Sequence, residues 1–286
     1  MKVVLFQIGS FSVYGYGLMM ALGIVAAFAL ALIRSKYFYK IDPDIFFNGG
    51  IIGLVFGLLG AKVTYWLVEI KSVIANPRML LDIGGGFVVY GGVILGILIP
   101  IIYLKKIRKT TVLDKLDLAM PSISIGQAIG RVGCLLAGCC YGRPVPEGAW
   151  YGITFPAGAE APAGVALYPT QIISAVGNLL LCVFLVLYTN KERFRGEVVT
   201  LYMILYSVGR FLVEFLRNDP RGNVGALSTS QFISIFVFAA GIGLWIFLKH
   251  KNLSPLRRAG RFVSAEEQKK ADQKEKEAGE DSGKQE

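Results

Sequence analysis

The amino-acid sequence predicts an all-α integral membrane protein with about seven transmembrane helices. Its 286 residues are 54% hydrophobic, with a mean hydropathy of +0.55. Only 17% are charged, whereas soluble domains carry about 25%. Several apolar runs approach the ~20 residues that a helix needs to cross a bilayer. The net charge of +10 is explained by basic cytoplasmic loops and anionic lipid headgroups, so we expect no nucleic-acid partner.

The predicted spans are apolar stretches separated by polar or basic segments. In chain order they are Gly17–Ile33, Phe46–Val68, Phe87–Leu104, Leu116–Ala137, Thr170–Leu187, Val198–Leu216 and Gln231–Leu248. The second stretch is rich in glycine, which permits close packing of helices. A loop over Lys71–Asp82 precedes the third stretch, and a long Pro-, Gly- and Ala-rich connection over Tyr141–Tyr168 follows the fourth.

Basic residues in the short loops indicate the orientation. The loops after the first, third and fifth stretches hold three, five and three Lys or Arg residues. Such loops stay in the cytoplasm, which places the N-terminus outside and the C-terminus inside. Residues 251–286 are charged and poor in aromatic residues, so we expect a disordered cytoplasmic tail after a membrane domain over residues 1–250.

Arg131 is a charge within the fourth apolar stretch. A charge at membrane depth costs at least ~2.5 kcal/mol on insertion scales, so it normally faces a polar cavity or a charged ligand. The predicted orientation places Arg131 and the following Arg143 in the extracytoplasmic half. We therefore expect this segment to line a site for an anionic, lipid-like substrate.

Arg210 and Glu214 are charges in the sixth stretch. With Arg217 they are spaced i, i+4 and i+7, which predicts one face of a helix. Arg210 and Glu214 either form a structural ion pair between helices, or the carboxylate holds the guanidinium toward a phosphate. Lys62, in the second stretch, either extends its ammonium toward the membrane surface or joins the arginines around one anionic headgroup.

Tyr90 lies in the glycine-rich segment that opens the third stretch. The glycines favour helix packing and a flexible entry to the span. The Tyr90 phenol can donate a hydrogen bond or act as a weak base. Its ordinary pKa of about 10 makes it a poor base unless neighbouring cations lower that pKa.

Three cysteines, Cys134, Cys139 and Cys140, follow Arg131. Their sequence pattern leaves several roles open: metal ligands, a redox pair, nucleophiles or small packing residues. A disulfide would fit an oxidising face of the membrane, although adjacent cysteines strain such a bond. No CxxC pair and no suitable histidine accompany them, since the single histidine is His250 in the last span's basic flank. We therefore expect no metal and no cofactor.

Several ordered motifs resemble those of the prolipoprotein diacylglyceryl transferase family, across nearly all predicted spans. They are Tyr16-Gly-Leu-Met, Gly60-Ala-Lys, Tyr90-Gly-Gly-Val-Ile-Leu-Gly, the pair Asp117 and Pro121, Gly130-Arg-Val-Gly-Cys-Leu-Leu-Ala-Gly-Cys-Cys-Tyr-Gly-Arg143, Tyr168-Pro-Thr-Gln171, and Arg210-Phe-Leu-Val-Glu214-Phe-Leu-Arg217. Departures from the family pattern are Lys62 for an arginine, Tyr90 for a histidine, Cys134 and Ala137 for asparagines, and Cys139 for a glutamate.

The resemblance implies a reaction and its partners. The family transfers the diacylglyceryl group of phosphatidylglycerol to the lipobox cysteine of a prolipoprotein signal peptide, forming a thioether and releasing glycerol phosphate. It implies a multi-pass enzyme of the bacterial cytoplasmic (inner) membrane, among membrane lipids, with its active site toward the extracytoplasmic face. The implied catalytic residues are Tyr90, Arg131, Arg210 and Glu214. The implied substrate-binding residues are Tyr16, Lys62, Cys134, Gly142, Arg143 and Gln171.

The replacement of the family's histidine by Tyr90 leaves two routes for the proton of the substrate thiol. Either the phenol takes it, or the thiol ionises beside the arginines. We favour the second route, because a nearby cation lowers a thiol pKa directly. The alternative function is that of a divergent paralogue that uses another phospholipid or acceptor, or binds lipid without turnover. A channel or transporter is disfavoured, because no inverted repeat is evident between the halves.

Overall fold

The computed structural model describes residues 4–8, 11–82, 84–191, 194–220 and 222–251, which form two compact units. The first unit contains the described residues up to 34 and from 113 onward, and the second those from 35 to 112. Helices of the first unit are α1 (Gly15–Ile33), α5 (Val112–Ala137), α6 (Thr170–Tyr188), α7 (Glu197–Glu214) and α8 (Thr229–His250). Helices of the second are α2 (Pro43–Val68), α3 (Ile70–Ala75) and α4 (Val89–Ile102).

The described chain also contains short strands and short helical turns. They are the strands β1 (Val4–Ile8), β2 (Phe11–Tyr14), β3 (Asn223–Val224) and β4 (Leu227–Ser228), the π-helical turns Arg34–Tyr39 and Tyr103–Ile107, and a 3₁₀ turn Pro77–Leu80. The strands form two antiparallel hairpins, β1–β2 and β3–β4.

The helices confirm a mostly helical, multi-pass membrane protein. Five of the described helices, counted with their π-helical extensions, are long and apolar enough to cross a bilayer: Gly15–Tyr39, Pro43–Val68, Val89–Ile107, Thr170–Tyr188 and Thr229–His250. Helices α5 and α7 cover the other two predicted stretches but carry several charges, Arg131 and Arg210 among them. The count of seven spans and the orientation of the termini therefore stay predictions.

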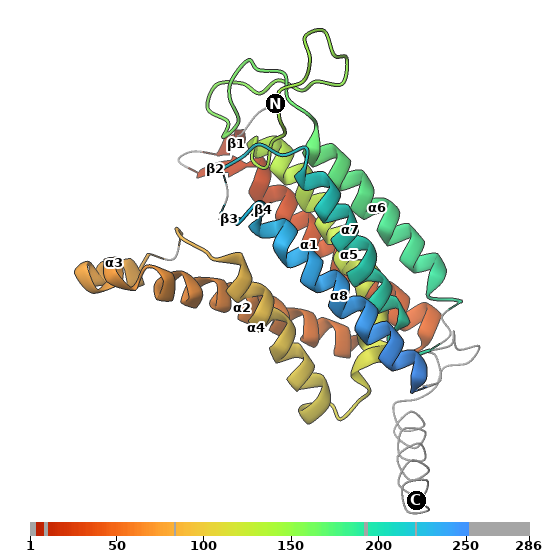
Figure 1. Ribbon diagram of the computed structural model, residues 1–286. Helices are drawn as coiled ribbons and strands as arrows, with labels where there is room; N and C mark the ends of the chain where they lie inside the picture. The colour runs from red at the N-terminus through yellow and green to blue at the C-terminus, as the bar shows by residue number, and fades with distance from the viewer. Residues whose placement is uncertain (1–3, 9–10, 83, 192–193, 221, 252–286) are drawn as a thin grey trace, which may run out of the picture. The chain divides into compact units, whose positions relative to one another are not determined.

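The five helices of the first unit run alongside one another (Figure 1). Glycine allows α1 and α5 to approach closely, because a Cβ atom added at Gly23 would lie 2.9 Å from the carbonyl oxygen of Gly126. A small buried cluster that includes Met120, Leu185 and Val198 joins α5, α6 and α7. These contacts hold the three helices that carry the candidate site.

Buried polar groups fasten the same helices to one another. The Asp117 carboxylate of α5 accepts hydrogen bonds from the backbone N–H groups of Gly196 (2.5 Å) and Val199 (2.8 Å) at the start of α7. Arg34, at the end of α1, donates to the α5 main chain (2.8 Å) and to the Thr189 hydroxyl after α6 (3.0 Å). The first N–H groups of a helix lack partners within it, so Asp117 caps α7 from a neighbouring helix.

Glycines line the contact between α2 and α4 in the second unit. A Cβ atom added at Gly60 would lie 2.5 Å from the carbonyl oxygen of Gly91, and one added at Gly92 would lie 2.8 Å from that of Gly57. Such small-residue contacts let helix backbones meet within a bilayer. The prediction that these glycines serve close helix packing is confirmed.

The structure corrects three sequence-based expectations. The predicted loop Lys71–Asp82 contains α3 and the 3₁₀ turn. The two hairpins have no counterpart in the predicted elements. The spacing predicts Arg217 on one helix face with Arg210 and Glu214, but the residue lies beyond the end of α7. The backbone there pairs instead with the loop after α5, and the Asn218 N–H donates to the carbonyl of Tyr141 at 3.1 Å. The predicted tail, apart from residue 251, lies outside the described residues.

Candidate functional site

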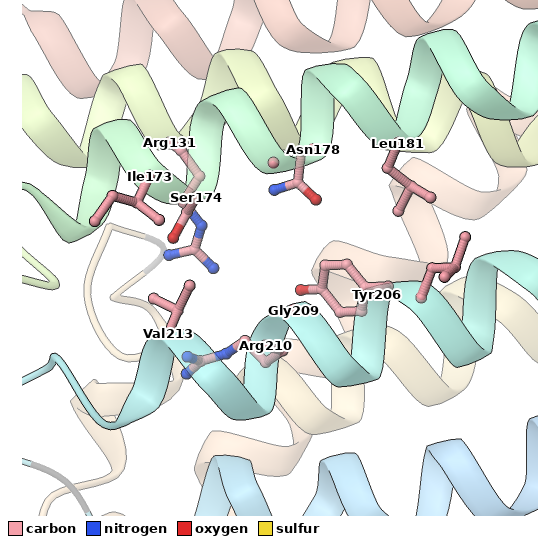
Figure 2. Close-up of a pocket in the computed structure, with 11 residues that line it drawn as sticks. Arg131, Ile173, Ser174, Asn178, Leu181, Tyr206, Gly209, Arg210 and Val213 are labelled. Carbon is pink, nitrogen blue, oxygen red and sulfur yellow. The ribbon is translucent and has the colours of Figure 1, made fainter.

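Helices α5, α6 and α7 line a cavity of about 200 Å³ in the first unit (Figure 2). Its polar lining comes from Arg131, Ser174, Asn178, Tyr206 and Arg210. The remaining lining is glycine and aliphatic side chains. Two guanidinium groups beside apolar walls suit a ligand that has an anionic head and a hydrocarbon body.

Arg131 reaches this cavity from α5 (Figure 2). The hydroxyl of Tyr206, on α7, points toward its guanidinium in the same view. The Nη1 atom of Arg131 also lies 3.7 Å from the sulfur of Cys140. Among the described residues no carboxylate forms a salt bridge with Arg131, so no carboxylate there neutralises its charge. The pairing of Arg131 with Tyr206 joins two helices around the cavity.

Arg210 approaches the cavity from α7 and is held by two partners. Its Nη1 atom lies 2.5 Å from Glu214 Oε2, four residues along the helix. Its Nη2 atom donates to the hydroxyl of Ser230 on α8 at 2.7 Å. The Glu214 side chain is only 4% exposed, so this ion pair is shielded from solvent. The ion pair forms within α7, and a role of the carboxylate in holding the guanidinium toward a phosphate stays a prediction.

Arg217 lies beside two carboxylates, and its Nε atom is 3.9 Å from Glu214 Oε2, the oxygen that also pairs with Arg210. Its Nε and Nη2 atoms donate to the two carboxylate oxygens of Asp219 at 2.9 and 3.0 Å. Burial raises the pKa of the Asp219 carboxyl, although Arg217 acts in the opposite direction. A two-pronged ion pair of this kind fixes the turn that follows α7.

A tight turn after α5 brings three thiols together. Gly138 and Cys140 both adopt positive φ, 75° and 60°. The sulfur atoms of Cys134, Cys139 and Cys140 lie within 4.8 Å of one another. The Cys134 and Cys139 side chains, by hydrogen bonding, together with Arg217, lower the pKa of the Cys140 thiol against the opposing effect of burial. The cysteines thus form one polar cluster beside Arg131.

The N-terminus of α6 holds this turn in place. The Gln171 amide donates to the carbonyl of Cys139 at 2.9 Å, and the Thr170 hydroxyl donates to that of Cys140 at 2.8 Å. Both side chains are buried, each at 1% exposure. Gln171, predicted to bind substrate, is therefore seen bonded to the backbone of the cysteine turn.

Three other predicted residues of the first unit lie outside the lining of the cavity. Gly142 is buried, and a Cβ atom there would meet the carbonyl oxygen of Tyr168 at 2.5 Å. The Arg143 side chain is exposed. Tyr16 is 44% exposed on α1 and packs beside Gly133 of α5. Substrate-binding roles for these residues stay predictions.

Lys62 belongs to the second unit and has partners there. Its ammonium group donates to the carbonyl of Gly85. It also lies over the rings of Tyr65, Trp66 and Phe87, at 5.4, 5.9 and 5.2 Å from their centroids. Cation–π contacts of this kind stabilise a buried cation and tie α2 to the segment that enters α4.

Tyr90 also belongs to the second unit, in the first turn of α4. Its side chain is 48% exposed. The two units are described separately, so the predicted convergence of Tyr90 and Lys62 with the arginines stays a prediction.

The sequence-based site omits Ser174, Asn178 and Tyr206 of the polar cavity lining, and Ser230, which holds Arg210. Tyr206 lies four residues before Arg210, a spacing that would have placed it on the same helix face. Asn178 is a polar residue within the apolar run of α6, and the sequence alone could have marked it as a candidate site residue for that reason. Ser230 has no local signal, because it meets Arg210 only through the packing of α8 on α7.

Comparison with known proteins relates the chain to one family. A family model described as prolipoprotein diacylglyceryl transferase matches residues 3–247. The phosphatidylglycerol–prolipoprotein diacylglyceryl transferase of Clostridium tetani is 48% identical over 242 residues, which cover 85% of this chain and 96% of that protein. The phosphatidylglycerol–prolipoprotein diacylglyceryl transferase 2 of Clostridium perfringens is 47% identical over 253 residues, covering 88% and 97%. The phosphatidylglycerol–prolipoprotein diacylglyceryl transferase of Finegoldia magna is 32% identical over 251 residues, which cover 87% of this chain and 96% of that protein.

Proposed function

The chain belongs to the prolipoprotein diacylglyceryl transferase family, and we propose on that basis that it transfers the diacylglyceryl group of phosphatidylglycerol to a prolipoprotein. The acceptor is the lipobox cysteine of the signal peptide. The product is a thioether, and glycerol phosphate leaves. The observation that carries the proposal is the cavity lined by both Arg131 and Arg210 among apolar helices.

The arginines supply what this reaction needs at the phosphate. Negative charge grows on the departing glycerol phosphate, and donors already aimed at that position stabilise the transition state most. Arg210 is oriented beforehand by Glu214 and Ser230. Arg131 has no competing carboxylate among the described residues. Apolar lining beside these cations accommodates the glyceryl group at the start of the acyl chains.

The acceptor thiol must lose its proton before it attacks, because the thiolate is the nucleophile. A cation within a few ångströms lowers a thiol pKa, so the arginines that bind the phosphate also favour the thiolate. The Tyr90 phenol is the competing base. Its side chain is 48% exposed in the second unit.

The setting proposed for this reaction is the bacterial cytoplasmic (inner) membrane. Seven spans, an outer N-terminus and a cytoplasmic C-terminus would place Arg131 and the cysteine turn in the extracytoplasmic half. Residues 1–250 then form the membrane domain and residues 251–286 a cytoplasmic tail. Prolipoproteins and phosphatidylglycerol both reach such a site from the bilayer.

Complementation tests the activity directly. In cells depleted of their own transferase, expression of this chain should convert a lipobox precursor to a species heavier by one diacylglyceryl group, as measured by mass spectrometry. A precursor whose lipobox cysteine is replaced by serine is the control and should stay unmodified. Good membrane expression with no adduct on either precursor would contradict the proposal. It would favour a paralogue with another substrate, or a protein that binds lipid without turnover.

Replacing Tyr90 by Phe separates the two routes for the thiol proton. We expect turnover to fall by less than about tenfold, whereas loss of a general base costs about a hundredfold or more. Tyr37→Phe, which alters an exposed tyrosine of the same unit, is the matched control. The rate of adduct formation is the measurement. A hundredfold loss confined to Tyr90→Phe would assign proton removal to the phenol.

A further inference from the structure

The three thiols after α5 have the spacing of a metal-binding set. Their sulfur atoms lie within 4.8 Å of one another. Zinc–sulfur bonds of ≈ 2.3 Å in a tetrahedral arrangement place sulfur atoms about 3.8 Å apart. Small side-chain rotations would close that difference. The sequence alone does not predict a metal here, because the cysteines are neither a paired CxxC motif nor accompanied by histidine.

The turn that carries the thiols is held rigidly enough to present them together. Cys140 adopts a φ of 60°, which a side chain other than glycine seldom adopts without support from its surroundings. Buried Thr170 and Gln171 supply that support through the carbonyls of Cys140 and Cys139. Rigid support of the groups that carry the ligands is what a metal site requires.

The charge around the cluster suits thiolates bound to a cation. Three thiolates and one divalent cation carry a net charge of −1. The guanidinium of Arg131, 3.7 Å from the Cys140 sulfur, would balance that charge. Sulfur ligands select thiophilic ions such as zinc over magnesium or calcium. The cluster is partly buried, so an ion would be shielded yet reachable.

We propose that Cys134, Cys139 and Cys140 bind one zinc ion and leave its fourth coordination position open for the thiol of the prolipoprotein cysteine. The second part of this inference rests on the proposed transferase function. Catalytic zinc sites use three protein ligands and one open position in the same way. A thiol that coordinates zinc is deprotonated. The cluster would therefore take over the activation that the family's polar motif residues would otherwise provide.

The resulting step is a nucleophilic substitution without electron transfer. The thiol proton passes to solvent when the sulfur binds zinc. A sulfur electron pair then forms a bond to the glyceryl carbon that carries the phosphate ester. The carbon–oxygen bond to that phosphate breaks, and its electron pair leaves with glycerol phosphate, which is protonated by solvent to the extent that its pKa dictates. Arg131 lies beside the cluster and lines the cavity, so it can contact both the thiolates and the departing phosphate.

Metal binding tests the site independently of activity. Purified protein in detergent, stripped with a chelator, should take up about one Zn²⁺ or Cd²⁺ per chain, with cadmium–thiolate absorption in the ultraviolet. Each of Cys134→Ser, Cys139→Ser and Cys140→Ser should weaken metal binding by at least about tenfold. Mutation of a residue that only hydrogen-bonds to a metal ligand already lowers metal affinity by about that factor, and loss of the ligand itself should cost no less. Cys182→Ser changes a buried cysteine of α6 outside the cluster and should bind as the unaltered chain does. Equal metal uptake by the triple serine variant would overturn the proposal.

A lipobox peptide tests the open position. Adding the cysteine peptide should change the cadmium–thiolate absorption, and adding its serine counterpart should not. Equal spectra with the two peptides would overturn the thiol-binding role. Full adduct formation by the triple serine variant would overturn the role of zinc in activating the thiol and leave the proposed function intact. Zinc uptake that depends on the cluster, together with no adduct in the complementation assay, would instead sustain the site and contradict the transferase.

Discussion

Replacing Arg131 by alanine is expected to lower the rate of diacylglyceryl transfer by at least about a hundredfold. Removal of one preorganised donor to a developing anion costs about 10²- to 10³-fold in comparable sites. Arg131 has this position at the cavity that Arg210 also lines, and no carboxylate among the described residues neutralises it. The measurement is the initial rate of adduct formation with phosphatidylglycerol vesicles and a lipobox peptide.

Two further variants make the Arg131 result specific. Arg131→Lys should recover part of the rate, because lysine keeps the charge but lacks the planar fork of donors that matches a phosphate. Arg108→Ala removes an arginine whose ion pair with Asp42 is one-third exposed, and should leave the rate unchanged. A rate for Arg131→Ala within about threefold of the unaltered chain, a loss of well under 1 kcal/mol in activation free energy, would exclude Arg131 from the reaction.

Replacing Asp117 by alanine is expected to lower the free energy of unfolding by about 3 kcal/mol. Its fully buried carboxylate accepts from the backbone N–H groups of Gly196 and Val199, and each buried N–H left without a partner costs about 1–3 kcal/mol. The free energy of unfolding of Asp117→Asn should lie between those of Asp117→Ala and the unaltered chain, because the amide keeps one acceptor oxygen. Unfolding of the purified protein in detergent, followed by circular dichroism, measures the difference.

Asp82 provides the matched control for Asp117. Its carboxylate also accepts from two backbone N–H groups, those of Gly84 and Gly85, but in an exposed turn of the second unit. Water can replace an acceptor there, so Asp82→Ala should cost about 1 kcal/mol or less. Equal losses for the two alanine variants would show that burial of the α7 cap contributes nothing to its strength.

The hydrophobic content and the ordered motifs were enough to predict the membrane class and the family. Both depend on local properties of the chain: the length and polarity of each apolar run, and the residue types at short spacings. Arg131 and Arg210 could be singled out for the same reason, because a charge within an apolar stretch is visible without a structure. The pairing of Arg210 with Glu214 follows from a spacing of four residues along one helix.

The remainder of the candidate site depends on contacts between distant parts of the chain. Ser230 meets Arg210 because α8 packs on α7, and Gln171 meets the cysteine turn because α6 begins beside the end of α5. The end of α7 before Arg217 depends on backbone pairing with the loop after α5. The grouping of the three thiols depends on a positive φ at Cys140. Residue types and spacings do not encode such contacts locally, because each is stabilised only once separate helices have packed together.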